Sequence, residues 1–238
     1  MERYLAVLVE RLAKVFDERL VSITLFGSAA SGDYHARFSD LNVLCVLDRI
    51  GPDELELCAP IFGWWRELGN PSPLLMTHDE VRRSTDSFPI EFSDMRESRK
   101  VLHGTDVIVG LEIDPRHHRA QVEHELRLSL LKLRQKATAV LGDRDALLKL
   151  CLDSVSTFCV LGRHALLLSG DTAVGLGKRA TVERLTAVTG PEVEALRELL
   201  DVREGRSAPQ EQDPANLFRR YLRAVQRVIE FVDGIGEP

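Results

Sequence analysis

The sequence predicts an α+β fold, with a mixed-sheet domain over residues 1–112 followed by an all-helical bundle over residues 113–238. Two observations support this division. Short apolar runs that suit strands alternate with helical segments in the first part, whereas the second part shows helical spacing throughout. Hydrophobic residues make up 44% of the 238-residue chain and charged residues 29%, so each part can bury a core.

Each predicted element of the first part has a local signal. Apolar residues at helical spacing predict a helix over 2–18, and the β-branched and aromatic run at 21–26 predicts a strand. A continuous apolar run at 43–47 is typical of a strand buried on both faces. A helix over 52–68 begins at a proline and ends before a Gly-Asn-Pro run. The remaining predicted elements are a short helix at 28–31, a strand at 74–77, a helical turn at 78–83 and a strand at 88–95.

The pattern of the second part is helical. A long helix is expected over 116–141 and another over 146–168, because apolar residues recur on one face of each and a glycine follows each. The further expected elements are helices at 180–188, 192–200 and 217–232 and a polar loop at 203–214.

The composition argues against several classes of protein. A formal net charge of −6 disfavours binding to a nucleic-acid backbone, which needs clustered positive charge. No apolar run reaches about 18 residues, so no membrane-spanning helix is expected. No signal peptide is visible, which predicts a cytoplasmic protein. The four cysteines lack paired spacing and are expected to be buried free thiols rather than zinc ligands.

A candidate phosphate site lies where the strand at 21–26 ends. Gly27 lets the backbone approach a ligand without a Cβ, and Ser28 stands at the start of the short helix. Free N–H groups and a hydroxyl at a helix start suit a phosphate. An ordinary strand-to-helix turn has the same pattern, so this pair alone leaves both interpretations open.

Candidate metal ligands follow along the chain. Asp40 precedes the next strand, and Asn42 lies two positions later on the same face, so both point toward one ion. Carboxylate and amide oxygens suit Mg²⁺, although Asp40 could equally cap a turn. Glu91, in the middle of the strand predicted at 88–95, would supply a further acid or act as general base on an attacking hydroxyl. If that strand is an edge strand, as Pro89 suggests, Glu91 would instead face water.

Taken together, these motifs resemble those of the DNA polymerase β-type nucleotidyltransferase superfamily, including its minimal and aminoglycoside nucleotidyltransferase-like members. The segments that carry the resemblance are Phe26-Gly27-Ser28, Ser39-Asp40-Leu41-Asn42-Val43 and Ile90-Glu91-Phe92. The resemblance implies that Gly27 and Ser28 bind a nucleoside triphosphate such as ATP. It also implies that Asp40, Asn42 and Glu91 hold Mg²⁺, with Asp40 and Glu91 as catalytic residues.

The reaction implied by the resemblance is attack of a hydroxyl, on a small molecule or a protein, on the α-phosphorus, with release of pyrophosphate. Asn42 departs from the family pattern, which has a second aspartate there, and its amide brings no negative charge. Two hypotheses follow: an active Mg²⁺-dependent nucleotidyltransferase with an altered metal site, or a catalytically silent nucleotide-binding or interaction module. The sequence leaves the acceptor, the preferred nucleotide and the oligomeric state open, a homodimer included.

Overall fold

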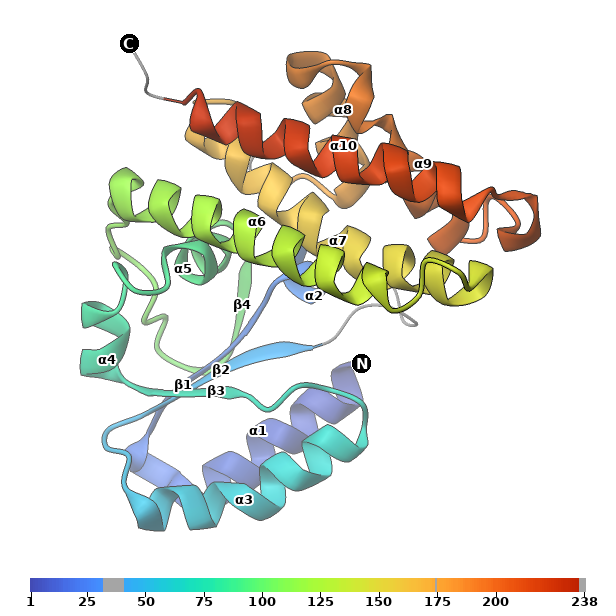
Figure 1. Cartoon of the computed structure of the whole chain (residues 1–238). Coiled ribbons are helices and arrows are strands. Elements are labelled where there is room, and N and C mark those ends of the chain that lie inside the picture. The colour runs from blue at the N-terminus through green and yellow to red at the C-terminus, as the bar shows by residue number, and fades with distance from the viewer. Residues whose placement is uncertain (32–40, 174, 236–238) are drawn as a thin grey trace. The chain divides into compact units, whose positions relative to one another are not determined.

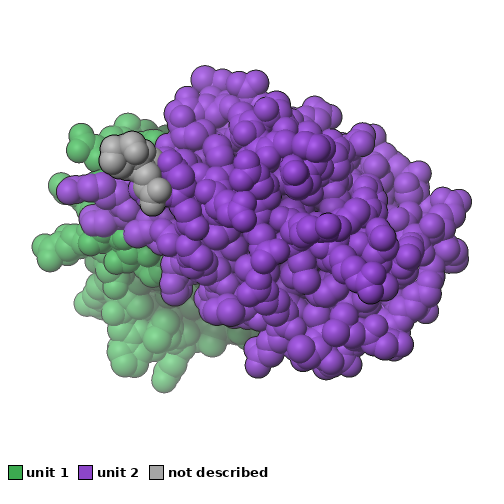
Figure 2. Space-filling model, turned by 45° about the horizontal axis from the view of Figure 1, so that its top comes forward, with its two compact units in different colours: residues 1–114 green, residues 115–238 purple. Residues whose placement is uncertain are grey.

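The computed structural model describes residues 1–31, 41–173 and 175–235, apart from the side chains of Ser28 and Ser31. The chain divides into two compact units, Met1–Asp114 and Pro115–Pro238, which Figure 2 colours green and purple. The first unit contains a four-stranded mixed sheet, and the second is built from helices. The predicted α+β fold class is therefore confirmed.

The first unit is organised around its sheet, in which the strands follow the order β3-β2-β1-β4 (Figure 1). β1 lies antiparallel to β2 and to β4, and β2 lies parallel to the edge strand β3. The elements are α1 (Glu2–Phe16), a 3₁₀ turn (Asp17–Arg19), β1 (Leu20–Phe26), α2 (Ser28–Ser31), β2 (Asn42–Leu47), α3 (Pro52–Glu67), β3 (Leu74–Thr77), α4 (His78–Arg83), α5 (Pro89–Glu97) and β4 (Arg99–Gly104).

Helices cover both faces of this sheet. α1 and α3 lie side by side on one face (Figure 1), where the fully buried Leu12 and Trp65 belong to the core. α4 and α5 contribute to a second core on the other face, which includes Phe92 and Met95. Every residue of β2 after Asn42 is buried, as predicted for a strand covered on both faces.

The strand predicted at 88–95 is wrong, because these residues form the helix α5. Pro89 occupies its first helical position, where the missing N–H removes no hydrogen bond and the fixed φ suits a helix. Strand alternation would bury Phe88 together with Phe92, yet Phe88 is 48% exposed and Phe92 is buried. The strand that completes the sheet is β4, which the sequence analysis does not predict because two basic residues begin it.

The second unit consists of five α-helices among its described residues, with two 3₁₀ turns between them. They are α6 (Pro115–Thr138), α7 (Arg144–Leu168), α8 (Lys178–Thr189), α9 (Glu194–Arg203) and α10 (Pro214–Asp233), and the turns are Pro191–Val193 and Pro209–Glu211. Buried polar contacts join the long helices. His118 Nε2 of α6 lies 2.9 Å from His164 Nδ1 of α7, and the hydroxyls of Ser154 on α7 and Tyr221 on α10 are 2.9 Å apart.

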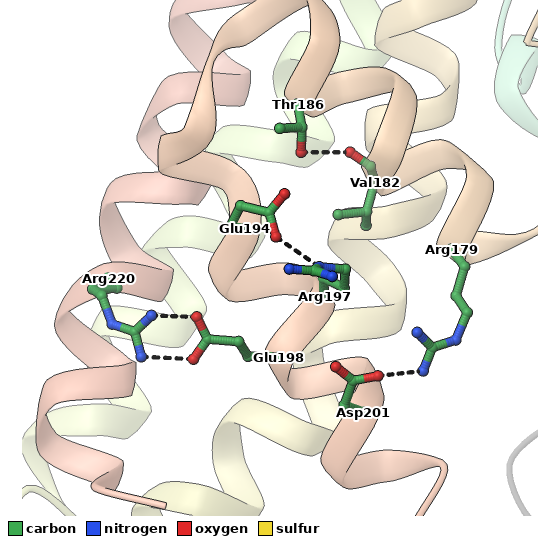
Figure 3. A network of polar contacts seen from close by, with 8 residues as sticks. All are labelled: Arg179, Val182, Thr186, Glu194, Arg197, Glu198, Asp201 and Arg220. Carbon is green, nitrogen blue, oxygen red and sulfur yellow. Dashed lines mark hydrogen bonds and ion pairs between the residues drawn. The ribbon is translucent and has the colours of Figure 1, made fainter. Parts of the chain in front are cut away.

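Ion pairs tie α9 to the helices on either side of it in the sequence (Figure 3). Both terminal guanidinium nitrogens of Arg220 on α10 donate to the two carboxylate oxygens of Glu198, which makes a bidentate pair. Arg179 on α8 donates to Asp201 on α9 at 2.7 Å. The acidic residues of α9 therefore link this helix to both α8 and α10.

All four cysteines are free and buried, as predicted. Cys45 and Cys58 lie in the first unit, and Cys151 and Cys159 lie in the second. Burial raises the pKa of Cys45 to about 12 and that of Cys151 to about 12, and it raises the pKa of Cys58 to about 11. These thiols are therefore held in their neutral form. No helix of the described ranges is long and apolar enough to cross a membrane.

Candidate functional site

The end of β1 has the conformation that the predicted phosphate turn needs. Gly27 directly follows β1 with a φ of +74°, in the left-handed region that residues with a Cβ rarely adopt. Its carbonyl accepts a hydrogen bond from the N–H of Ala30 at 2.9 Å, so the chain turns at once into α2. The backbone of Ser28 begins this helix, and its side chain lies outside the described residues.

Asn42 lies beside this turn. It begins β2 and pairs with Phe26, the last residue of β1. A Cβ added to Gly27 would stand 3.1 Å from Asn42 Nδ2, so the side-chain amide fills the space that glycine leaves open. The sheet thus brings together two of the predicted site residues that are well separated in the sequence.

Asn42 points to the face of the sheet that carries α5. Asn42 shares one face of β2 with Leu44 and Val46, which follow it at intervals of two residues. Both belong to the core that includes Phe92 of α5. Asp40, the predicted metal ligand and catalytic residue, lies outside the described residues. Its assignment therefore stays a prediction.

Glu91 lies in the first turn of α5, not on a strand. Its Oε2 atom is buried and has no hydrogen-bond partner among the described residues. It lines a cavity of about 410 Å³ that also borders Leu74 and Met76 of β3. Because these two residues pair with Leu44 and Val46, the cavity lies two to four residues along β2 from Asn42, which corresponds to about 7 to 13 Å.

A basic residue completes the row of the sheet that contains Asn42. Phe26 pairs with Asn42 on one side and with Arg99 of β4 on the other. Arg99 donates through Nε to both carboxylate oxygens of Asp106 at 2.9 Å and through Nη1 to the carbonyls of Met95 and Arg96 at the end of α5. The hydrogen bond from Arg99 holds the pKa of Asp106 below its usual range.

Sequence reasoning also misses Asn70, whose side-chain Oδ1 accepts a hydrogen bond from the N–H of Leu41 at 3.3 Å. This contact fixes the chain immediately before β2. In the sequence, Asn70 belongs to the Gly-Asn-Pro run that ends a helix, and such a run indicates only a loop. Nothing in that pattern points to Leu41, 29 residues earlier, with which Asn70 makes contact.

The two candidate donor groups fit a hard cation in kind, although no contact joins them in the described part of the chain. Asn42 offers an amide oxygen and Glu91 an unpartnered carboxylate oxygen, and both are ligand types that Mg²⁺ accepts. Within the described part of the chain, however, no group of three or more His, Cys, Asp or Glu side chains is placed to hold a metal ion. A complete magnesium site would therefore need Asp40 in addition.

No protein-family model matches the sequence, and a search of the curated proteins also finds no match. Among the solved structures, the chain is similar to the spectinomycin adenyltransferase AAD(9) from Enterococcus faecialis, crystallised with ATP and spectinomycin. The similarity covers 96% of this chain and 99% of that chain, with a TM-score of 0.60. The chain has a nucleotidyltransferase-like fold.

The nucleotidyltransferase-like fold confirms the resemblance inferred from the motifs at the level of architecture. Sequence identity to AAD(9) is 12%, so the likeness is one of backbone arrangement. It extends over both units, including the helices of the second.

Proposed function

We propose that this chain is a Mg²⁺-dependent nucleotidyltransferase that moves a nucleoside monophosphate from a nucleoside triphosphate to a hydroxyl of a small molecule or protein. The observation that carries the proposal is the meeting of Gly27 and Asn42 at the end of β1 and β2. In this proposal, residues 1–112 form the nucleotidyltransferase domain and residues 113–238 form a helical-bundle domain.

The roles proposed for the residues follow from their chemistry. Gly27 and Ser28 would bind the triphosphate, because a glycine with positive φ exposes backbone N–H groups to an anion. Asp40 and Asn42 would hold Mg²⁺, with Glu91 as the third ligand and second acid. When bound, Mg²⁺ supplies Lewis-acid stabilisation of charge on the phosphate oxygens.

The reaction is an in-line displacement. The acceptor oxygen forms a bond to the α-phosphorus while the bond from that phosphorus to the bridging oxygen of the β-phosphate breaks, and pyrophosphate leaves. The hydroxyl proton passes to a carboxylate, for which Glu91 is the proposed base. Within the chain, the neutral Asn42 lowers the negative charge available for this site by one relative to a second aspartate.

The test measures pyrophosphate release from labelled ATP with Mg²⁺, with spectinomycin and other aminoglycosides as the first acceptors because AAD(9) was crystallised with ATP and spectinomycin. Asp40→Ala and Glu91→Ala should each abolish transfer. Asn42→Asp should lower the Mg²⁺ concentration needed for half-maximal rate, because it restores a second charged ligand. Transfer retained in both alanine variants would remove the proposed mechanism.

A second candidate function is nucleotide binding without transfer. It is favoured by the neutral Asn42 and by the basic Arg99, which pairs with Phe26 on the side opposite Asn42. ATP that binds in the presence of Mg²⁺ without releasing pyrophosphate, across nucleotides and a broad acceptor screen with mass detection of adducts, would identify this function.

A further inference from the structure

The cavity beside Glu91 is built from three elements of the first unit. β3 contributes Leu74 and Met76, α4 contributes Glu80, and α5 contributes Phe92 together with Glu91. Its volume is about 410 Å³, which is within the range of sites for small organic molecules. It has a buried floor at Phe92, which is 2% exposed, and an exposed apolar rim at Leu74, which is 43% exposed.

The polar groups of the cavity are predominantly acidic. Its charged lining residues are Glu80 and Glu91, and no lysine, arginine or histidine among the described residues lines it. Glu91 Oε2 is buried without a hydrogen-bond partner among those residues. A buried carboxylate oxygen without a partner is costly, and a bound donor that carries positive charge would remove that cost.

Glu80 is held in place by the fold. Its Oε2 accepts hydrogen bonds from the N–H and the Oγ1 of Thr77, at 2.7 and 2.9 Å, in the capping box that begins α4. Its other oxygen, Oε1, takes no part in this capping box. One carboxylate at the rim is therefore positioned before any ligand arrives, which lowers the entropic cost of binding.

We propose that the cavity between β3, α4 and α5 binds a small organic cation, with a primary ammonium group held by Glu91 and Glu80 and an apolar body packed on Phe92 and Leu74. The ammonium group offers three donors, enough for both carboxylates and for the hydroxyl of Ser84, which also lines the cavity. Exposed Phe88 at the rim adds an aromatic face that attracts a cation. This site goes beyond the proposed transfer reaction: it shares Glu91 with that reaction, but it needs neither nucleotide nor Mg²⁺.

The test uses the full chain without nucleotide or Mg²⁺, and it compares three probes with one skeleton by calorimetry or ligand-observed NMR. Phenethylamine should bind. 2-Phenylethanol, which keeps the apolar body and loses the charge, should bind roughly tenfold more weakly or worse, because hydrogen bonds to charged groups are the stronger ones. Phenylacetate should bind still more weakly, because two carboxylates repel it.

Glu91→Gln and Glu80→Gln should each weaken phenethylamine binding by about tenfold, because each removes one charge while keeping the shape. Glutamine also serves in a capping box, so Glu80→Gln leaves α4 intact. Glu56→Gln, on the exposed face of α3 and away from the cavity, is the matched control and should bind as wild type does. Thermal melts of all three variants verify that each is folded.

Absence of phenethylamine binding to the wild-type chain would overturn the proposal. Equal affinity of the wild-type chain for phenethylamine and 2-phenylethanol would also overturn it. So would phenethylamine binding that is equally tight in the wild type, Glu91→Gln and Glu80→Gln. Asp40→Ala should keep full amine binding while it loses nucleotide transfer, which separates this site from the proposed function. Loss of transfer in Glu91→Gln with unchanged amine binding would overturn the cation site and leave the proposed function standing.

Discussion

Replacing Gly27 by alanine tests the contact that the proposed nucleotide site depends on. The substitution forces a residue with a Cβ to keep a φ of +74°, and it places that Cβ 3.1 Å from Asn42 Nδ2. Both effects act at the point where the ends of β1 and β2 meet. We therefore expect Gly27→Ala to lower stability and to displace the amide of Asn42.

Gly69 provides a matched control for the magnitude. It has a φ of +88°, and a Cβ there would meet nothing within 4 Å. Left-handed strain costs about 1–2 kcal/mol and reduced chain entropy in the unfolded state returns about 0.4–1 kcal/mol, so Gly69→Ala should cost about 1 kcal/mol. The crowded contact at Gly27 should add about 1 kcal/mol more, for a total of about 2 kcal/mol.

The assay is urea unfolding followed by tryptophan fluorescence. Both tryptophans of the chain, Trp64 and Trp65, lie on α3, so their signal reports on the first unit alone. ATP binding is measured on the same variants, and Gly27→Ala should bind ATP more weakly than Gly69→Ala. The reasoning is refuted if the two variants lose equal stability and bind ATP equally well.

Three further predictions concern stability. In Asp106→Asn, the free energy of unfolding, measured at pH 7, 4 and 3, should fall less at acid pH than it does in the wild type. The pKa of Asp106 is lowered on folding, so its stabilising contribution is present above the ordinary aspartate pKa of about 3.9 and is lost as the pH falls below that value. The same loss of stability at acid pH in the variant and the wild type would contradict the conclusion that Arg99 lowers the pKa of Asp106. A double-mutant cycle of Glu198→Ala and Arg220→Ala should give a coupling of about 0.5–1 kcal/mol, modest because both side chains are more than a third exposed, and a coupling near zero in low salt would contradict the bidentate pair. Tyr221→Phe should cost about 1 kcal/mol in thermal or urea unfolding, because Ser154 keeps its bonds to the carbonyls of Leu150 and Cys151; a neutral result would mean that the hydroxyl contact adds no stability.

Much of the fold could be predicted because local and long-range signals agree. The continuous apolar run at 43–47 is typical of a strand covered on both faces, and β2 is such a strand. The strand predicted at 88–95 is wrong because an apolar alternation over a few residues fits a strand and a helix alike. Its burial, with Phe88 exposed and Phe92 buried, is decided by the sheet on which α5 packs, and the sequence does not contain that information locally.

The candidate site also contains both residues that the sequence predicts and residues that it does not. Gly27 could be predicted because a glycine after a strand has a specific conformational reason to be there, and its positive φ agrees with that reason. Asn70 and Arg99 could not, because their contacts depend on which loops and strands become neighbours in the folded sheet. Glu91 is a candidate because it is an acid among apolar residues. Although it lies on a helix and not on a strand, one of its carboxylate oxygens is buried.

The four buried cysteines allow the opening of each unit to be followed by the rate at which its thiols react. A thiol-reactive reagent needs the thiolate, so labelling of Cys45 or Cys151 requires a fluctuation that exposes the side chain to water. Because two cysteines lie in each unit, peptide-resolved mass spectrometry after timed labelling yields a separate opening rate for each unit from one sample. Added ATP should slow the labelling of Cys45 and Cys58 in the first unit more than that of the two cysteines in the second, if the nucleotide binds where Gly27 and Asn42 meet.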